Sequence, residues 1–548
     1  MSDIDVLIVG GYSLTEVAGG TSETLNKMRL HHNGHLATVD FLKCLVDKAG
    51  DLDLAEKQYA EQNKSRLVSR SLNTIYLYDF LTKYGIRTEA VNYFLLEQDK
   101  FKRLMAAKPR VVAISTTFMC HTSEVIAIAQ AARELSPGSV ILAGGIKVLK
   151  SYKTYTLFKQ GYLEGFDMEP VKSNNFFFDA STDNRVDALV IEECGELTLL
   201  RLVRKIKNGE DYRCTPNIAY RKGNHLVFTK RVREPSTFDQ HAISWDRVPE
   251  SIIGNAIPVK AGMGCPFRCA FCDFWGLHRV QSRPIECVIE ELKTIQDVYP
   301  GKPVEFTDDN LFTTPSRIKQ LCKGIIENGL DFKWGAFVRT DAITEDNVEM
   351  LAKAGCFVCA LGTESGDNGI LKNMNKETTR DQNLKAVHFL SKHLISTTST
   401  VIVGFPGETE DSVAKTIDLL NSYPDVSYPV HRYYPFAFLL SPLTPIASPG
   451  NRRRYGITGG TDTWSHSTMD WKQANDQVLR MFSEVGTPTL RYSENPHAVL
   501  PATKITATLK TRDNIVKSGI TVISDHNADS IYQMFRPIFE EREVCHVS

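Results

Sequence analysis

The chain has 548 residues, of which 42% are hydrophobic and 24% charged, and its 64 basic and 65 acidic side chains give a formal net charge of −1. These values are typical of a globular protein of about three domains, and they give no support for nucleic acid or an anionic membrane as a partner. No run of about 18 apolar residues predicts a membrane span, and the acidic start MSDIDVLIVGGYS does not resemble a signal peptide. Twelve cysteines, mostly scattered singly, favour a reducing compartment, so we expect a cytoplasmic protein.

The first part of the chain predicts a parallel sheet with helices on its faces. Strands are expected at 4–10, 86–94, 110–118, 139–145 and 186–196, and helices at 71–85, 123–137 and 197–210. Such alternation, with glycines at the strand ends, is typical of α/β domains that bind ligands at the carboxyl ends of their strands. Residues 15–70 and 150–180 interrupt the pattern as irregular insertions. A hairpin turning at Gly223-Asn224 and a linker-like segment follow, which places a domain boundary near residue 240.

A second strand and helix series begins at Ile257. Its strands are expected at 257–264, 303–309, 332–339, 356–366, 396–405 and 430–438, with helices such as 285–299 and 316–329 between them. Six β–α units in this order predict an open or partial parallel barrel whose functional residues lie on the loops after the strands. The predicted domains are 1–240, 241–428 and 429–548. The last is a C-terminal cap with helices near 470–485 and 527–541.

The stretch GCPFRCAFCDFWG, residues 264–276, carries three cysteines in a C-x3-C-x2-C spacing: Cys265, Cys269 and Cys272. A tetrahedral zinc site needs a fourth ligand nearby, and the spacing of His278 is not typical of one. A structural [4Fe–4S] cluster takes four cysteines. Three thiolates therefore favour an iron–sulfur cluster with one iron open to a small molecule, with a zinc site completed from afar and an accidental trio as the alternatives.

This loop, with the aromatic Phe271 just before its last cysteine, resembles that of the radical S-adenosylmethionine (SAM) superfamily, and the resemblance extends over roughly 250–425. It implies that SAM binds the open iron and is cleaved by one electron to methionine and a 5′-deoxyadenosyl radical, which takes a hydrogen atom from substrate. It also implies an external electron donor of the flavodoxin or ferredoxin type. Besides Phe271, the SAM contacts that it implies are Asp308, Asp309, Arg339, Glu364 and Gly404, although the two aspartates could instead hold the loop.

The N-terminal pieces IDVLIVGG, PRVVAISTTF, VILAGGIKV and VDALVIEECGE resemble the cobalamin-binding domain that precedes radical SAM domains in one large class. The cobalamin contacts implied by this Rossmann-like (flavodoxin-like) domain are Gly10, Gly11, Ser115, Thr116, Thr117, Gly144, Gly145 and Glu193. The Asp-x-His-x-x-Gly motif that ligates cobalt in classical mutases is absent from the sequence. The resemblance therefore leaves the lower cobalt ligand open, and a flavodoxin-like domain without a cofactor is the alternative.

Together these features resemble the class B, cobalamin-dependent radical SAM methyltransferases, which move a methyl group from methylcobalamin to a substrate radical. We expect a small-molecule substrate in specialised or antibiotic biosynthesis, and the chain length favours the P-methylases of phosphinothricin-type pathways. In the cap, arginines could hold a carboxylate or a phosphorus oxyanion. The candidate substrate contacts are Arg432, Tyr433 and Arg452. The alternatives are a cobalamin-dependent radical SAM cyclase or rearrangement enzyme and a non-catalytic iron–sulfur scaffold.

Overall fold

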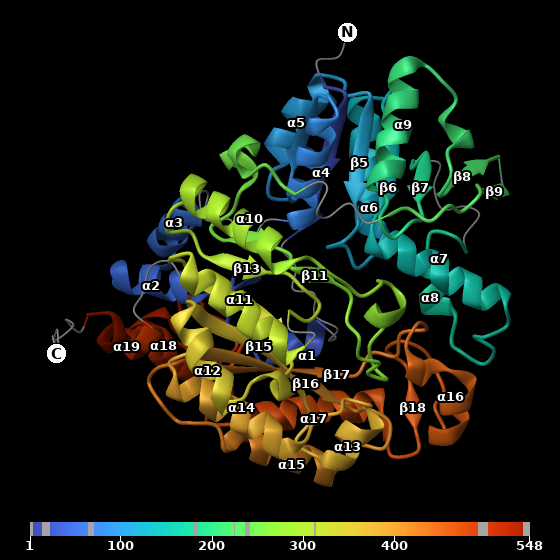
Figure 1. Cartoon of the computed structure of the whole chain (residues 1–548). Helices are drawn as coiled ribbons and strands as arrows, with labels where there is room; N and C mark the ends of the chain where they lie inside the picture. The colour runs from blue at the N-terminus through green and yellow to red at the C-terminus, as the bar shows by residue number, and fades with distance from the viewer. Residues whose placement is uncertain are drawn as a thin grey trace.

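The computed structural model describes residues 4–13, 22–63, 71–178, 185–223, 225–235, 242–311, 314–491 and 502–540. Two sheets of seven strands each organise the molecule, the first in the upper and the second in the lower part of Figure 1. The predicted boundary near residue 240 and Asn224 of the predicted turn lie outside the described residues. Within the described ranges, no helix has both the length and the apolar character needed to cross a bilayer.

The first sheet has the strand order β4-β1-β5-β6-β7-β8-β9. Its strands are β1 (Val6–Val9), β4 (Thr88–Val91), β5 (Val111–Ser115), β6 (Val140–Gly144), β7 (Ala188–Val190), β8 (Ile218–Lys222) and β9 (His225–Phe228). The first five are parallel, whereas β8 and β9 form an antiparallel hairpin. Its helices are α4 (Leu72–Lys83), α5 (Gln98–Ala106), α6 (Thr122–Leu135), α7 (Ile146–Lys159), α8 (Glu169–Ser173) and α9 (Glu196–Asn208). The predicted parallel α/β domain is confirmed, and α7 occupies the start of a stretch expected to be irregular.

The second sheet is parallel throughout, in the order β10-β13-β14-β15-β16-β17-β20. Its strands are β10 (Ile257–Val259), β13 (Val304–Phe306), β14 (Trp334–Val338), β15 (Cys356–Glu364), β16 (Ser396–Val403), β17 (His431–Ala437) and β20 (Thr489–Leu490). Its helices are α10 (Ile285–Val298), α11 (Pro315–Glu327), α12 (Glu345–Lys353), α13 (Asn368–Asn373), α14 (Arg380–Lys392) and α15 (Glu410–Asn421). All six predicted strands are present. The sheet also continues past residue 428, because β17 and the short β20 extend it into the segment predicted to be the cap.

The N-terminal insertion packs against the C-terminal part of the chain. The insertion contains α1 (Ser22–Lys27), β2 (His31–His32), β3 (His35–Leu36), α2 (Val39–Asp47) and α3 (Leu52–Asn63). The C-terminal helices are α16 (Pro449–Tyr455), α17 (Trp471–Glu484), α18 (Ala502–Lys517) and α19 (Ala528–Glu540). The His31 N–H donates to the Thr521 carbonyl at 2.9 Å, and the Ile523 N–H donates to the His31 carbonyl at 2.7 Å. Helix α2 accordingly lies beside α18 and α19 (Figure 1), although the sequence placed it in the first domain.

The parallel register separates the second sheet into two faces, because successive side chains of a strand point to opposite sides. Two hydrogen bonds identify the face of the sheet that helices cover. His431 of β17 bonds to Ser391 in the last turn of α14, and Ser399 of β16 bonds to Tyr423 just after α15. The helix-covered face includes the registered rows Phe306, Ala336, Cys359, Thr397, His431 and Val338, Leu361, Ser399, Tyr433, Leu490. The opposite face includes the row Phe337, Ala360, Thr398, Arg432.

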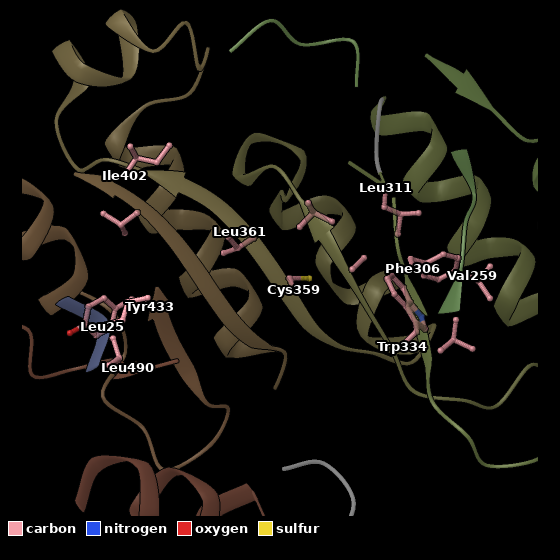
Figure 2. Packing of buried hydrophobic residues seen from close by; sticks show 14 of the residues in the cluster. Leu25, Val259, Phe306, Leu311, Trp334, Cys359, Leu361, Ile402, Tyr433 and Leu490 are labelled. Carbon is pink, nitrogen blue, oxygen red and sulfur yellow. The ribbon is translucent and has the colours of Figure 1, made fainter. Parts of the chain in front are cut away.

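Tyr433 belongs to the hydrophobic core. Figure 2 shows its ring beside Leu25 and Leu490, and only 1% of the residue is exposed. The predicted contact of Tyr433 with a substrate stays a prediction, and the ring itself lies on the helix-covered face. The sequence did not reveal this because every residue of β17 except Phe436 is buried, so alternation of burial could not separate the faces.

Replacing Tyr433 by Phe should leave the thermal midpoint unchanged or raise it. The Tyr433 hydroxyl is buried with no hydrogen-bond partner in the described structure, so its removal relieves a desolvation cost of about 1 kcal/mol. The matched control is Tyr423→Phe, which deletes a hydroxyl that hydrogen-bonds Ser399 Oγ at 2.8 Å and should lower stability by about 1 kcal/mol. Thermal unfolding followed by circular dichroism measures both. A clear loss of stability in Tyr433→Phe would contradict this account.

Candidate active site

The three clustered cysteines lie on one loop directly after β10. Strand β11 (Gly262–Met263) pairs antiparallel with β12 (Gln281–Ser282) and closes the loop at its base. Gly264 begins the loop at φ 74°, and a Cβ there would lie 2.6 Å from the Arg279 carbonyl oxygen. Only glycine therefore fits at this position. The thiols of Cys265, Cys269 and Cys272 are all free.

The loop environment disfavours thiolates that have no cationic partner. Burial, reinforced by Asp273 and the two other thiols, raises the pKa of Cys272 to about 12. Burial also raises the pKa of Cys269, which the positive charges of Lys376 and Arg339 oppose. A thiolate needs nearby positive charge or a metal to form at neutral pH. The charges of neighbouring cysteines thus affect the pKa of Cys269 and of Cys272, and the cations Arg339 and Lys376 lie close to Cys269.

The donor set fits an iron–sulfur cluster better than a single metal ion. In the part of the chain that the structure describes, no three His, Cys, Asp or Glu side chains converge as the ligands of one ion would. His278, the nearest zinc ligand candidate, has its Nδ1 3.6 Å from Glu193 Oε1. In an iron–sulfur cluster each cysteine thiolate binds a different iron atom. Three thiols on one loop can therefore ligate a cluster without converging on one point.

Asp308 and Asp309 hold the cysteine loop. Asp308 Oδ2 accepts the Ala261 N–H at 3.0 Å, and Asp309 Oδ2 accepts the Gly264 N–H at 2.9 Å. Burial, which outweighs these backbone hydrogen bonds, raises the pKa of Asp308 to about 6. Of the two roles that the sequence left open for these carboxylates, the contacts are those of loop anchors.

Arg339 packs beside the second cysteine. Its guanidinium carbon lies 3.7 Å from the centre of the Phe267 ring, and its Nη1 lies 4.0 Å from Cys269 Sγ. The same guanidinium pairs with Asp341 at 2.9 Å and donates to the Lys376 carbonyl at 2.6 Å. These contacts fix a buried positive charge next to the thiol.

Glu364 and Lys376 form a buried ion pair at 3.0 Å. The second Glu364 oxygen accepts the Thr400 hydroxyl at 3.3 Å, and Glu364 has φ 60°, a left-handed conformation that costs a non-glycine residue energy. Lys376 Nζ also lies 5.8 Å from the centre of the Phe271 ring. Sequence reasoning missed Lys376 because it follows α13 in an irregular segment, and no local spacing links it to a glutamate twelve positions earlier.

Gly404 is confined by its neighbours and fully hydrogen-bonded. At φ 86°, a Cβ there would lie 2.6 Å from both Trp464 and Ala474 side-chain atoms. Its N–H donates to Glu408 Oε2 at 2.5 Å, and its carbonyl lies 3.1 Å from His466 Nε2. Burial raises the pKa of Glu408 to about 8, so this carboxyl holds a proton at neutral pH. The backbone contacts of Gly404 are thus all internal.

The structure brings seven of the eight predicted cobalamin contacts to one edge of the first sheet, at the carboxyl ends of β1, β5 and β6. Thr116 donates through its N–H and its hydroxyl to the Gly144 carbonyl, at 2.8 and 2.9 Å. Gly145 has φ 109°, and a Cβ there would lie 3.2 Å from both Thr116 and Thr117. The tight backbone at this edge leaves little room for side chains.

Glu193, the eighth predicted cobalamin contact, faces the other domain. Its Oε1 accepts the Arg279 N–H at 2.6 Å. Burial is the largest single influence on the Glu193 carboxyl, and it acts to raise the pKa. His278 and the Arg279 N–H together outweigh burial, so the Glu193 pKa lies below its usual value. Glu193 therefore joins the carboxyl end of β7 to the cysteine loop.

The two predicted arginines of the cap differ in their surroundings. The terminal nitrogens of Arg452 donate to the carbonyl oxygens of Glu164, at 3.0 Å, and Gly165. Its guanidinium also packs over the Phe166 ring. These contacts join α16 to the first domain, and the predicted contact of Arg452 with a substrate stays a prediction. Arg432 lies on the face of the second sheet opposite Tyr433 and is buried.

Residues 259–420 match the family model described as the radical SAM superfamily. The chain is 29% identical over 251 residues to an uncharacterized methyltransferase, PH0819, of Pyrococcus horikoshii, covering 44% of this chain and 54% of that protein. It is 26% identical over 309 residues to the anaerobic magnesium-protoporphyrin IX monomethyl ester cyclase of Rubrivivax gelatinosus, covering 54% and 55%. It is 32% identical over 170 residues to the bacteriochlorophyllide d C-12(1)-methyltransferase of Chlorobaculum tepidum, covering 30% and 37%. The chain thus spans about half the length or less of these curated relatives.

Two solved structures share the fold over nearly the whole chain. The radical SAM methyltransferase TsrM from Kitasatospora setae, with cobalamin and a [4Fe–4S] cluster bound, has a TM-score of 0.55 at 14% identity and covers 98% of this chain and 99% of its own. The cobalamin-dependent SAM radical enzyme OxsB, with aqua-cobalamin and SAM bound, has a TM-score of 0.51 at 14% identity, covering 97% and 66%. The chain therefore shares its overall α/β fold with these two structures.

Replacing Lys376 by Met should lower the free energy of unfolding by about 3 to 5 kcal/mol, because it leaves the Glu364 carboxylate buried without its partner. The double variant Lys376→Met/Glu364→Gln should recover much of this loss, since no buried charge remains. Chemical denaturation of the single and double variants measures the coupling. The control is Lys353→Met, which breaks the exposed pair with Glu349 and should change stability little, because water screens the pair. Equal losses in Lys376→Met and the control would contradict the assignment.

Replacing Glu408 by Gln should flatten the pH dependence of stability between about pH 4.5 and pH 8. The folded chain holds the Glu408 proton up to a pKa of about 8, whereas the unfolded chain releases it near 4.5. Between these values the folded state binds more protons, so this group lowers wild-type stability as the pH rises. Thermal midpoints across this range measure the effect. Glu410→Gln, on the exposed first turn of α15, is the control and should run parallel to wild type.

Proposed function

We propose, from the premise that residues 259–420 are a radical SAM domain, that the chain is a cobalamin-dependent radical SAM methyltransferase. The observation that carries the proposal is the loop after β10, which offers three free thiols within eight residues and contacts the first domain through Glu193. A three-thiol loop suits a cluster with one open iron. The shared fold of TsrM and OxsB supports the pairing of the two domains.

When bound, a [4Fe–4S] cluster with SAM supplies a 5′-deoxyadenosyl radical, and methylcobalamin supplies the methyl group. The chain's own part is to hold and orient these groups. Cys265, Cys269 and Cys272 would ligate the cluster, while Asp308 and Asp309 fix their loop through backbone N–H groups. Preorganised groups of this kind lower a barrier because they need no rearrangement during the reaction.

The charges around the loop support a cofactor with anionic sulfur. Arg339 and Lys376 place two buried cations near Cys269 and favour its thiolate. Glu364, at the end of β15, is the acceptor proposed for SAM hydroxyls, with the Phe271 ring and van der Waals contact at Gly404 as further proposed contacts. In the first domain, the loops at Gly10, Ser115 and Gly144 are the proposed cobalamin cradle.

The proposed substrate is a small molecule of specialised biosynthesis, methylated at carbon or at a phosphinate phosphorus. Arg432 supports an anionic substrate, because this buried cation lies on the sheet face opposite the one that α14 and α15 cover. Guanidinium binds carboxylate and phosphorus oxyanions through paired hydrogen bonds. One electron from a flavodoxin or ferredoxin in the cytoplasm would start each turnover.

A second candidate is a cobalamin-dependent radical SAM cyclase that transfers no methyl group. The 26% identity over 309 residues to an anaerobic magnesium-protoporphyrin IX monomethyl ester cyclase favours this alternative. Product mass separates the two, since methylation adds one CH2 unit and ring closure by oxidation does not.

Anaerobic reconstitution with iron and sulfide, followed by SAM, dithionite and methylcobalamin, tests the proposal. Wild type should bind an iron–sulfur cluster and form 5′-deoxyadenosine, whereas Cys269→Ala should do neither, because one of three ligands is lost. Cys287→Ala removes an exposed thiol of α10 and serves as the control that keeps both properties. Iron analysis, electron paramagnetic resonance and product mass provide the readouts. Zinc in place of iron, or no SAM cleavage under strong reductant, would overturn the proposal.

A further inference from the structure

Helix α7 connects the proposed cofactor edge of the first domain with the cysteine loop. It begins directly after Gly145 and carries three lysines spaced three residues apart, Lys147, Lys150 and Lys153. Lys147 Nζ donates to the Asn174 carbonyl at 2.9 Å, inside the first domain. Lys150 Nζ pairs with Asp273 Oδ2 at 2.9 Å, and Lys153 Nζ donates to the Gly276 carbonyl. Successive turns of one helix therefore contact both domains.

The segment Asp273–Arg279, immediately after Cys272, is held at both ends by the first domain. At its start, Lys150 pairs with Asp273 and lies 5.1 Å from the centre of the Phe274 ring. At its end, Glu193 accepts the Arg279 N–H. The segment forms only one short 3-10 turn, Phe274–Gly276, and joins no sheet. Contacts from outside the segment therefore have a large share in fixing its position.

The two carboxylates in these contacts are poorly hydrated. Asp273 is 9% exposed, and besides Lys150 it accepts the Ser441 hydroxyl at 3.1 Å. The Glu193 side chain is 12% exposed. Partly buried carboxylates that lose a partner pay a desolvation cost, so these contacts resist displacement of the loop.

We propose that Lys150, Lys153 and Glu193 are positioning residues through which the first domain sets the conformation of the cysteine loop. Helix α7 begins at the carboxyl edge of the first sheet and contacts the cysteine loop through Lys150 and Lys153. A ligand that binds at this edge therefore shifts the segment after Cys272. The identity of the ligand rests on the proposed function, whereas the contacts themselves do not.

Hydrogen–deuterium exchange of the full apo chain tests the positioning role. In Lys150→Met/Glu193→Ala, peptides covering 272–281 should exchange about tenfold faster than in wild type, as expected for losing hydrogen bonds to charged groups. Peptides of β13 to β16 should be unchanged. Lys159→Met is the control, because its ammonium lies over Tyr155 at the far end of the same helix. Unchanged exchange at 272–281 in the double variant would overturn the proposal.

Hydroxocobalamin as a probe tests the coupling. In wild type it should slow exchange both at 113–118 and 144–150 and at 272–281. In the double variant the protection at 113–118 should remain while that at 272–281 is lost. Protection at 272–281 that persists in the double variant would overturn the coupling. Absence of any protection in wild type would overturn the coupling and the proposed cobalamin site together, and the apo comparison still decides the positioning role on its own.

Discussion

The candidate site depends on the hydrogen bonds that attach the cysteine loop to two adjacent carboxylates. Asp308 and Asp309 follow β13, and they accept backbone N–H groups on either side of β11, so they fix the point from which the cysteine loop departs. A buried carboxylate is costly unless it is hydrogen-bonded, and its donors here belong to the segment that carries the chemistry. The same contacts that satisfy the charge therefore place the thiols.

The fold brings two carboxyl edges of parallel sheets into contact at this loop. Glu193 follows β7 in the first sheet, while the cysteines follow β10 in the second. Ligand-binding loops gather at such edges, so two edges that meet form one shared site. Helix α7 and the turn that receives Arg452 add further contacts between the domains.

Much of the fold follows from local sequence patterns. Short apolar runs such as 4–10 and 110–118 sufficed for β1 and β5, and the cysteine spacing sufficed for the loop. Two-residue β20 has no periodicity to detect, and α18 and α19, which pack against α2, lie more than 400 positions away from it. Tyr433 and Arg452 show what the sequence does not predict about the site. Their residue types suggested a role in binding substrate, but only tertiary contacts show where each side chain lies. Lys376 was missed for the same reason.

The joining of the N-terminal insertion to the C-terminal helices has a consequence for biosynthesis. His32 hydrogen-bonds Ile523, which follows it by 491 positions. At about 5 to 20 residues per second, translation needs roughly 25 to 100 s to deliver that partner. The side of α2 that packs against α18 and α19 stays uncovered for this whole interval, so this part of the core closes only after the last helices have been synthesised.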